Sequence, residues 1–191
     1  MAMSWTRDDV IRHCAVCAAT GNRIDLSGRD LTGVNLTGLD LRLADLREAD
    51  LREADMREAD MRKANLRLAD LRLADLRGAN LRLADLREAD LRLANMLLAD
   101  LRYADLREAD MREANLRGTD LTGAIGIVCL HVDDPRGYRP IAVDHGTHWM
   151  IASGCRWLTA ADALAHWGED DYHTPELGQA YCRAIRELPP K

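Results

Sequence analysis

Residues 44–57 read ADLREADLREADMR, and this five-residue rhythm decides the fold. From Leu26 to Leu121 every fifth residue is Leu or Met, twenty times in succession, and each follows Asp or Asn. On an α-helix a step of five residues turns about 500°, so successive leucines would form no apolar stripe. On a strand, an odd step would send successive leucines to opposite faces. The chain must therefore turn once per five residues, which predicts a solenoid whose central side chains share one axis.

Each five-residue unit, or pentad, contains a small residue, Asp or Asn, a central Leu and two variable residues, as in residues 44–48, 69–73 and 109–113. This pattern covers about half of the chain and resembles the pentapeptide-repeat family. The resemblance implies an all-β solenoid, a right-handed quadrilateral β-helix with four pentads in each coil. The twenty pentads of residues 24–123 would then form about five coils.

The central and small positions are expected to face inward, with the other three positions in solvent. The central residues chosen to represent the predicted core are Leu46, Leu66, Leu71, Leu76, Leu86 and Leu106. Fifteen consecutive alanines occupy the small position from Ala44 to Ala114, but four larger residues precede them. One of the four is Arg29, whose charge is costly to bury, so we expect an irregular first coil.

Residues 1–23 are predicted to form a helical cap. Thr6 and Asp9 have the spacing of a capping box, and Gly21 ends the segment. Apolar residues recur at helical spacing at Val10, Ile11, Cys14, Cys17 and Ala18. We expect this face to cover the first coil, because an open solenoid end exposes apolar core and unpaired strand edges. Both cysteines are then interpreted as buried structural thiols.

Composition excludes several classes of protein. The chain has 191 residues and a net charge of −6, with no apolar run of membrane-spanning length and no signal-peptide pattern. We therefore predict a cytoplasmic protein without membrane contact. Five scattered cysteines do not form the disulfide framework of a small secreted domain. No segment is basic enough to predict direct binding of nucleic acid.

Residues 124–191 lack the repeat and are predicted to form a small α+β domain. Short strands are expected at residues 126–132, 138–143 and 147–152. Helices are expected from Thr159 to about Gly168 and from Thr174 onward. Residues 154–159, followed by His166 and Trp167, resemble a small module found after pentapeptide repeats in some bacteriophage proteins. This second resemblance implies a phage origin but assigns no chemistry.

Two chemical alternatives stay open for this domain, although no catalytic residue, cofactor or metal is assigned. Cys155 and His166 are the residue types of a thiol nucleophile and its base, with Asp162 or Asp170 to orient the imidazole. The cysteines and histidines could also supply a structural zinc site, but no Cys-x-x-Cys or His-x-x-x-His pair occurs there. Apolar residues along the helix at 175–188 offer a third alternative, a homodimer contact.

The outer surface of the solenoid carries charges of both signs. Residues 24–123 contain twenty-one acidic and seventeen basic residues, and columns of arginines would repel unless carboxylates interleave with them. Some members of the resembled family mimic duplex DNA and bind DNA gyrase or related topoisomerases. A mixed surface weakens that reading without removing it, because charge can still segregate between faces.

Sorting the residues by coil position identifies candidate interaction surfaces. With four pentads per coil, Leu43, Leu83 and Tyr103 share one face, and Glu48, Glu88 and Glu108 share another; Leu73 and Leu93, or the isolated Leu98, lie on the remaining two. The leading hypothesis is a non-enzymatic protein-binding scaffold, phage-encoded and acting on a host protein, with modulation of gyrase as a sub-hypothesis. The alternatives are a structural, oligomer-forming solenoid and the enzyme or zinc domain described above.

Overall fold

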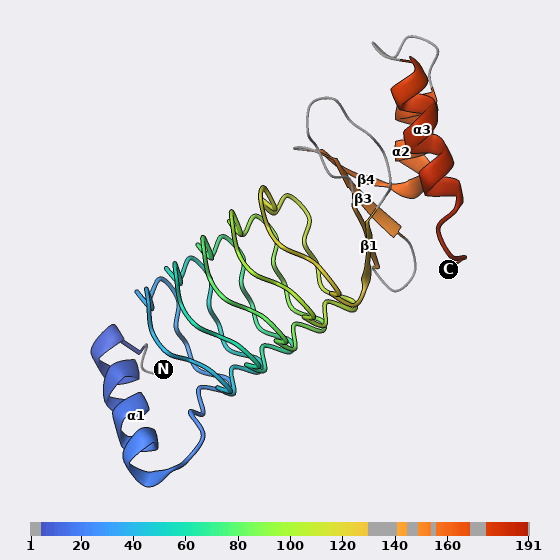
Figure 1. Cartoon of the computed structure of the whole chain (residues 1–191). Helices are drawn as coiled ribbons and strands as arrows, with labels where there is room; N and C mark the ends of the chain where they lie inside the picture. The colour runs from blue at the N-terminus through green and yellow to red at the C-terminus, as the bar shows by residue number, and fades with distance from the viewer. Residues whose placement is uncertain (1–4, 130–140, 145–148, 154–155, 169–174, 191) are drawn as a thin grey trace. The chain divides into compact units, whose positions relative to one another are not determined.

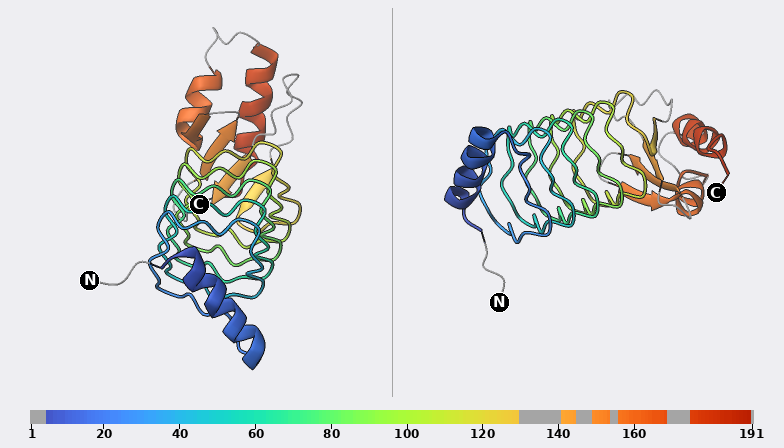
Figure 2. Two further views of the ribbon diagram at one scale, coloured as in Figure 1. Left: turned by 90° about the vertical axis from the view of Figure 1, so that its left-hand side faces the viewer. Right: turned by 90° about the horizontal axis from the view of Figure 1, so that it is seen from below.

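A computed structural model describes residues 5–129, 141–144, 149–153, 156–168 and 175–190. Contacts within the chain divide it into two compact units, Met1–Ile125 and Gly126–Lys191. The first unit consists of one helix and a stack of coils, and the second combines a sheet with two helices (Figures 1 and 2). No helix in the described part of the chain has the length and apolar character needed to cross a bilayer.

The repeats form a quadrilateral β-helix, which confirms the predicted fold class. Parallel bridges join each Asp or Asn position to the residue twenty positions later, from Asp25–Asp45 to Asp105–Ile125. A coil therefore contains four pentads, and successive coils stack along one axis (Figure 1). Backbone hydrogen bonds such as Leu71 N–H to Asp90 O, with an N–O distance of 2.7 Å, join neighbouring coils on each side.

A tight turn ends every pentad. In the pentad of Leu71, the Ala74 N–H donates to Leu71 O at 3.1 Å, and the fifth residue, Leu73, has a φ of 61°. Positive φ at the third turn residue is the signature of a type II turn. Fourteen of the twenty fifth positions hold a residue other than glycine, although this conformation costs such a residue about 1–2 kcal/mol. The turns consequently fix the direction of every fifth-position side chain.

The central and small positions form the core. The six central leucines chosen from the sequence are all 0–1% exposed: Leu46, Leu66, Leu71, Leu76, Leu86 and Leu106. Met56 and Met61 fill the same position elsewhere and are equally buried. The column therefore accepts either side chain, because both are unbranched at Cβ and of similar volume.

The first coil is regular, so the expected irregularity is wrong. Its backbone bonds to the second coil have ordinary lengths, as in Leu26 N–H to Asp45 O and Leu31 N–H to Asp50 O, both 2.8 Å. Arg29 is exposed, and its guanidinium lies 5.2 Å from the centroid of the Trp5 ring. Because the first coil has no coil above it, this side chain leaves the core at the open end.

Helix α1 (Arg7–Thr20) begins and ends where the sequence predicts. The Thr6 N–H donates to Asp9 Oδ2 at 3.0 Å, the Asp9 N–H donates to Thr6 Oγ1 at 3.3 Å, and Gly21 ends the helix with a φ of 69°. Its buried stripe is narrower than the sequence predicts. Val10 and Cys17 are buried, whereas Ile11 is 42% exposed.

The segment around α1 satisfies backbone groups at the open edge of the first coil. The Arg7 guanidinium donates to Asn35 O at 2.8 Å and to Thr37 O at 3.1 Å, and the Trp5 N–H donates to Asp30 O at 3.0 Å. These carbonyls have no coil above them to bond. The N-terminal segment thus acts as the edge cover that a solenoid requires (Figure 1).

The second unit contains a four-stranded antiparallel sheet in the order β1-β2-β3-β4, together with two helices. The elements are β1 (Ile127–Cys129), β2 (Ile141–Asp144), β3 (Trp149–Ser153), β4 (Arg156–Thr159), α2 (Ala160–Gly168) and α3 (Pro175–Arg186). The sequence did not predict β4, because the strand has only four residues and the last of them is a helix N-cap. That cap is Thr159, whose Oγ1 accepts from the Asp162 N–H at 3.1 Å.

Part of the apolar face of α3 packs inside this unit, and the homodimer contact predicted for residues 175–188 stays a prediction. Cys182 and Ile185 are each 4% exposed, in one cluster with Ala142, Ile151 and Ala163. Ala184 and Leu188 pack against that cluster, so these residues are not free for a second copy. Of the residues in the thiol and zinc alternatives, Cys155, Asp170 and the histidines at 131, 145, 148 and 173 lie outside the described residues.

Candidate functional site: the outer faces of the β-helix

The β-helix has four faces, each a stack of five pentads. Faces 1, 2, 3 and 4 are defined by the first-coil central residues Leu26, Leu31, Leu36 and Leu41 and by every twentieth residue after each. Summing the charged side chains of each face gives net charges of −3, −2, 0 and +1 in that order. Negative charge therefore gathers on two neighbouring faces, but no face is strongly negative.

Most outward aspartates are neutralised within their own pentad. Arg57 donates from Nε to Asp55 Oδ1 at 2.8 Å and from Nη2 to Asp55 Oδ2 at 2.7 Å. This bidentate bond lowers the pKa of Asp55 to about 2. The same pair is made by the arginines at positions 42, 47, 52, 57, 62, 72, 77, 87, 92, 102, 107 and 112.

Neighbouring coils share these charges, so carboxylates do interleave with the arginine columns. On face 2 the distances from arginine Nε to the aspartate Oδ2 of the next coil are 3.7 Å for Arg52–Asp70 and 3.6 Å for Arg72–Asp90. The third such pair, Arg92–Asp110, is 3.7 Å apart. Face 2 thus carries an unbroken Asp–Arg ladder from Asp50 to Arg112.

Where asparagine replaces aspartate at positions 65 and 80, the arginine of the same pentad does not make the bidentate pair and contacts the next coil. Where Asn65 replaces aspartate, Arg67 reaches the next coil and donates to Glu88 Oε1 from Nε at 3.0 Å and from Nη2 at 2.7 Å. Where Asn80 replaces it, the Arg82 guanidinium lies 5.7 Å from the centroid of the Tyr103 ring. An amide offers neither the charge nor the second acceptor oxygen that a guanidinium fork needs.

The apolar strip predicted on face 4 is exposed but divided. Leu43, Leu83 and Tyr103 are 56%, 45% and 50% exposed. Lys63 lies between the two leucines in the column. The Tyr103 ring is covered on one side by Arg82, and its Cδ1 would lie 2.5 Å from a Cβ added at Gly123. The tyrosine is therefore engaged within the protein.

The acidic strip predicted on face 1 is also interrupted. Glu48, Glu88 and Glu108 share one column, but Leu68 lies between the first two and is 44% exposed. Glu88 is the acceptor of Arg67, with their closest atoms 2.7 Å apart. The strip therefore presents two separate carboxylates, which is a weak basis for recognition by charge.

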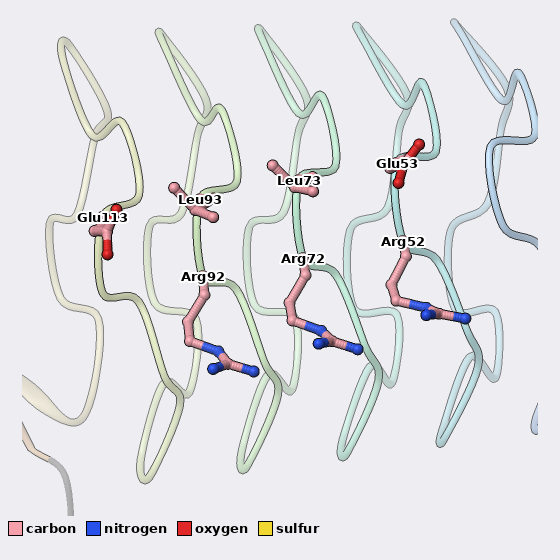
Figure 3. A pocket seen from close by; sticks show the side chains of 7 residues that line it. All are labelled: Arg52, Glu53, Arg72, Leu73, Arg92, Leu93 and Glu113. Atoms are coloured by element: carbon pink, nitrogen blue, oxygen red, sulfur yellow. The ribbon is translucent and has the colours of Figure 1, made fainter.

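A groove on face 2 was not singled out from the sequence. Its volume is about 320 Å³, and Figure 3 shows the residues that line it: Arg52, Glu53, Arg72, Leu73, Arg92, Leu93 and Glu113. Leu73 and Leu93, in adjacent coils, are 54% and 49% exposed. The signal in the sequence was a pair of outward leucines twenty residues apart with a glutamate one coil beyond each.

Comparison with models of known protein families identifies the family of the repeats. The family model described as "Pentapeptide repeats (8 copies)" matches residues 30–67, 69–102 and 99–125. The resemblance of residues 154–167 to a bacteriophage module is not supported, because the family match lies within residues 30–125. A search of curated proteins gives no match.

Several solved structures are similar to this chain. HetL, a pentapeptide repeat protein involved in heterocyst differentiation regulation in Nostoc sp. strain PCC 7120, is 35% identical over 64% of this chain and 48% of its own, with a TM-score of 0.55. Rfr23 of Cyanothece 51142 is 36% identical over 45% of this chain and 58% of its own, at a TM-score of 0.45. QnrB1, a plasmid-mediated fluoroquinolone resistance protein, is 22% identical over 52% of this chain and 59% of its own, at 0.23.

The chain spans about half the length of HetL and somewhat more of Rfr23. The family match covers nearly all of the coils, and the coils show the twenty-residue period that four pentads require. The chain belongs to the pentapeptide-repeat family.

Proposed function

We propose that this protein is a non-enzymatic scaffold that binds a protein partner through the outer faces of its β-helix. The observation that carries the proposal is the set of exposed apolar side chains at fifth positions, which are 44–68% exposed: Leu43, Leu68, Leu73, Leu83, Leu93, Leu98 and Tyr103. They are spread over the four faces, and Leu73 and Leu93 lie in adjacent coils of face 2; exposed apolar side chains that lie next to one another are typical of interaction sites. We expect the scaffold to act in the cytoplasm.

The backbone supports recognition because it is already ordered. All seven of these residues lie in turns with φ between 59° and 61°. Hydrogen bonds to the next coil hold each turn, as between the Leu73 N–H and Arg92 O at 3.1 Å. Since little conformational entropy remains to be lost, such a surface binds a partner at reduced entropic cost.

The chemistry of the described residues favours binding over catalysis. In the part of the chain that the structure describes, no three His, Cys, Asp or Glu side chains are grouped so that they could hold a metal ion. Twelve aspartates of the coils accept two hydrogen bonds from an arginine, which occupies both carboxylate oxygens. They are therefore poor candidates for general acid or base chemistry near neutral pH.

Charge density argues against duplex mimicry as the mode of binding. Five coils at strand separation span about 24 Å, and a DNA duplex of that length carries about fourteen negative charges. Residues 24–123 carry a net charge of −4. We infer that contacts with the apolar columns dominate recognition, and gyrase remains a partner to be tested in its own right.

Affinity capture with the full chain tests the proposal. Proteins retained from a bacterial lysate by the wild type would be identified by mass spectrometry. We expect a specific partner that is lost when Leu43, Leu73, Leu83, Leu93 and Leu98 are changed together to Gln. A matched control, with Glu48, Glu58 and Glu108 changed to Gln at other fifth positions, should keep the partner. Retention by the leucine variant, or no specific partner for the wild type, would contradict the proposal.

A further inference from the structure

The fifth-position column of face 2 is symmetric along the axis. Successive coils place Glu53, Leu73, Leu93 and Glu113 in one row, beside a parallel row of Arg52, Arg72 and Arg92 (Figure 3). The two central leucines are about half exposed and form one wall of the groove. An apolar centre therefore lies between two carboxylates that are three coils apart.

The arginines that line the groove are already paired with aspartates. Arg72 Nη2 lies 2.6 Å from Asp70 Oδ2, and its Nε lies 3.6 Å from Asp90 Oδ2. Arg52 and Arg92 are held between two carboxylates in the same way. By contrast, Glu53 and Glu113 make no ion pair or side-chain hydrogen bond with the described residues. An occupant that supplies two cations would complete the charge balance of this groove.

The spacing of the column selects an extended occupant. Coils stack at about 4.8 Å, so Glu53 and Glu113 are about 14 Å apart along the axis. An extended peptide rises about 3.4 Å per residue and places residues i, i+2 and i+4 on one face, so i and i+4 span almost the same distance.

We propose that this groove binds an extended segment of a partner protein with the pattern basic-x-aliphatic-x-basic. The two basic side chains pair with Glu53 and Glu113, and the aliphatic side chain between them packs on Leu73 and Leu93. This inference rests on the proposed function and names the chemistry of the partner.

The columns of faces 1 and 4 do not offer the same pattern. On face 1 the central carboxylate, Glu88, is already bound by Arg67, and on face 4 the column contains Lys63. A second copy of this chain is also a poor occupant. Two face 2 columns related by a twofold axis would oppose Glu53 to the Glu113 of the other copy, and like charges repel.

Titration of the full chain by NMR tests the proposal. Leucine methyl groups would be labelled with ¹³C, and the Leu73 and Leu93 signals would be assigned from Leu73→Ala and Leu93→Ala. The probe is the peptide acetyl-Lys-Thr-Leu-Thr-Lys-amide, with its isomer acetyl-Thr-Lys-Leu-Lys-Thr-amide as the spacing control. We expect the first peptide to shift both methyl signals and to bind several-fold more tightly than its isomer.

Paired variants locate the contact. Loss of two exposed ion pairs in Glu53→Gln/Glu113→Gln should raise the Kd by about tenfold. The matched variant Glu48→Gln/Glu108→Gln, with the same charge change on face 1, should leave the Kd within about twofold. Equal effects of the two variants, equal binding of the two peptides, or unshifted Leu73 and Leu93 methyl signals would overturn the proposal.

Analytical sedimentation tests whether a second copy of this chain, instead of a peptide segment, occupies the groove. We expect a wild-type monomer, and a dimer abolished by Glu53→Gln/Glu113→Gln would assign the groove to a second copy and overturn the peptide proposal. Failure here is distinguishable from failure of the proposed function. If a captured partner still depends on the exposed leucines while neither peptide binds, the scaffold function stands and this assignment of face 2 is wrong.

Discussion

At the scale of single residues, the turn geometry separates fold from function. All twenty fifth positions have positive φ, whether they hold Gly, Glu, Leu, Lys or Tyr. The backbone there is fixed by hydrogen bonds from the coil below and by the four-residue turn, not by the side chain. Exposed chemistry can therefore vary along the column without disturbing the core, which is what a binding scaffold needs.

Substitutions at neighbouring positions of one pentad should differ in cost. Leu71 is 1% exposed, so Leu71→Ala should lower the free energy of unfolding by about 2–5 kcal/mol through lost burial and a cavity. The Arg72 side chain is 38% exposed and its ion pairs are screened, so Arg72→Ala should cost no more than about 1 kcal/mol. Urea unfolding measures both. Equal losses would mean that the assignment of inside and outside is wrong.

Two glycines with similar φ should respond differently to alanine. At Gly28, φ is 63° and an added Cβ would meet nothing within 4 Å, so Gly28→Ala should cost only the conformational strain of about 1–2 kcal/mol. At Gly123 the Cβ would lie 2.5 Å from Tyr103 Cδ1, so Gly123→Ala should cost about 1 kcal/mol more.

A double-mutant cycle identifies the contact responsible for that difference. In a Tyr103→Ala background, the excess cost of Gly123→Ala over Gly28→Ala should disappear. An excess that persists without the ring would point to strain elsewhere in the last coil.

The sequence predicted which residues are buried but not which partner each arginine takes. The five-residue period alone separates Leu71 from Arg72. The partners of Arg67 and Arg82 are 21 residues further along the chain, at Glu88 and Tyr103. Such pairs can be recognised only when the number of residues per coil is known. They also require the knowledge that an arginine next to asparagine lacks its usual aspartate partner.

At the scale of elements, the Asp–Arg ladder explains how columns of like charge coexist. Each arginine of face 2 from Arg52 to Arg92 lies between the aspartates of two coils, so repulsion between arginines one strand spacing apart is offset. The ladder also holds side chains that would otherwise be free to move. A groove beside it consequently has one rigid wall.

The ladder should make stability depend on acidic pH. Arg57 donates to Asp55 and lowers its pKa from 3.8 to about 2. A carboxylate whose pKa is lower in the native state than in the unfolded state stabilises the fold when the pH is above its unfolded-state pKa. It loses that contribution as the pH falls through its native-state pKa. The pKa values of Asp45, Asp75 and Asp85 are lowered by the same bond from arginine.

We therefore expect the urea midpoint to be constant from about pH 7 to pH 5 and to fall between about pH 4 and pH 2. In the variant Asp55→Asn the drop over that acidic range should be smaller, because one linked carboxylate has been removed. A midpoint that already falls between pH 7 and pH 5 would assign the pH dependence to groups other than the ladder.

Helix α1 and strand β4 show what local sequence can and cannot specify. The capping box of Thr6 and Asp9 and the terminal Gly21 are short-range signals, and they place α1 correctly. Strand β4 has four residues and depends on pairing with β3, as in Ile151 with Leu158. Its local sequence carries no alternation long enough to predict a strand, so tertiary pairing decides it.

At the scale of the whole molecule, the repeat predicts a surface made of columns but not their use. The predicted strips on faces 1 and 4 do lie in single columns, yet Arg67 and Arg82 engage Glu88 and Tyr103 within the protein. The groove on face 2 needs three-dimensional information, because its carboxylates are free only if the arginines beside it are already neutralised.

The same neutralisation leads to a prediction about gyrase. Duplex mimicry requires dense charge of one sign, but here twelve arginine–aspartate pairs leave −4 over residues 24–123. We expect saturating wild-type protein to leave ATP-dependent supercoiling by gyrase unchanged. The triple variant Arg52→Gln/Arg72→Gln/Arg92→Gln uncovers the aspartates of face 2 and, if its circular dichroism is unchanged, separates charge from fold. Inhibition by the variant and not by the wild type would show that the arginine–aspartate pairs hide a surface able to mimic duplex DNA. Salt-sensitive inhibition by the wild type would instead mean that recognition by charge survives the pairing, and that the apolar columns are not the dominant contact.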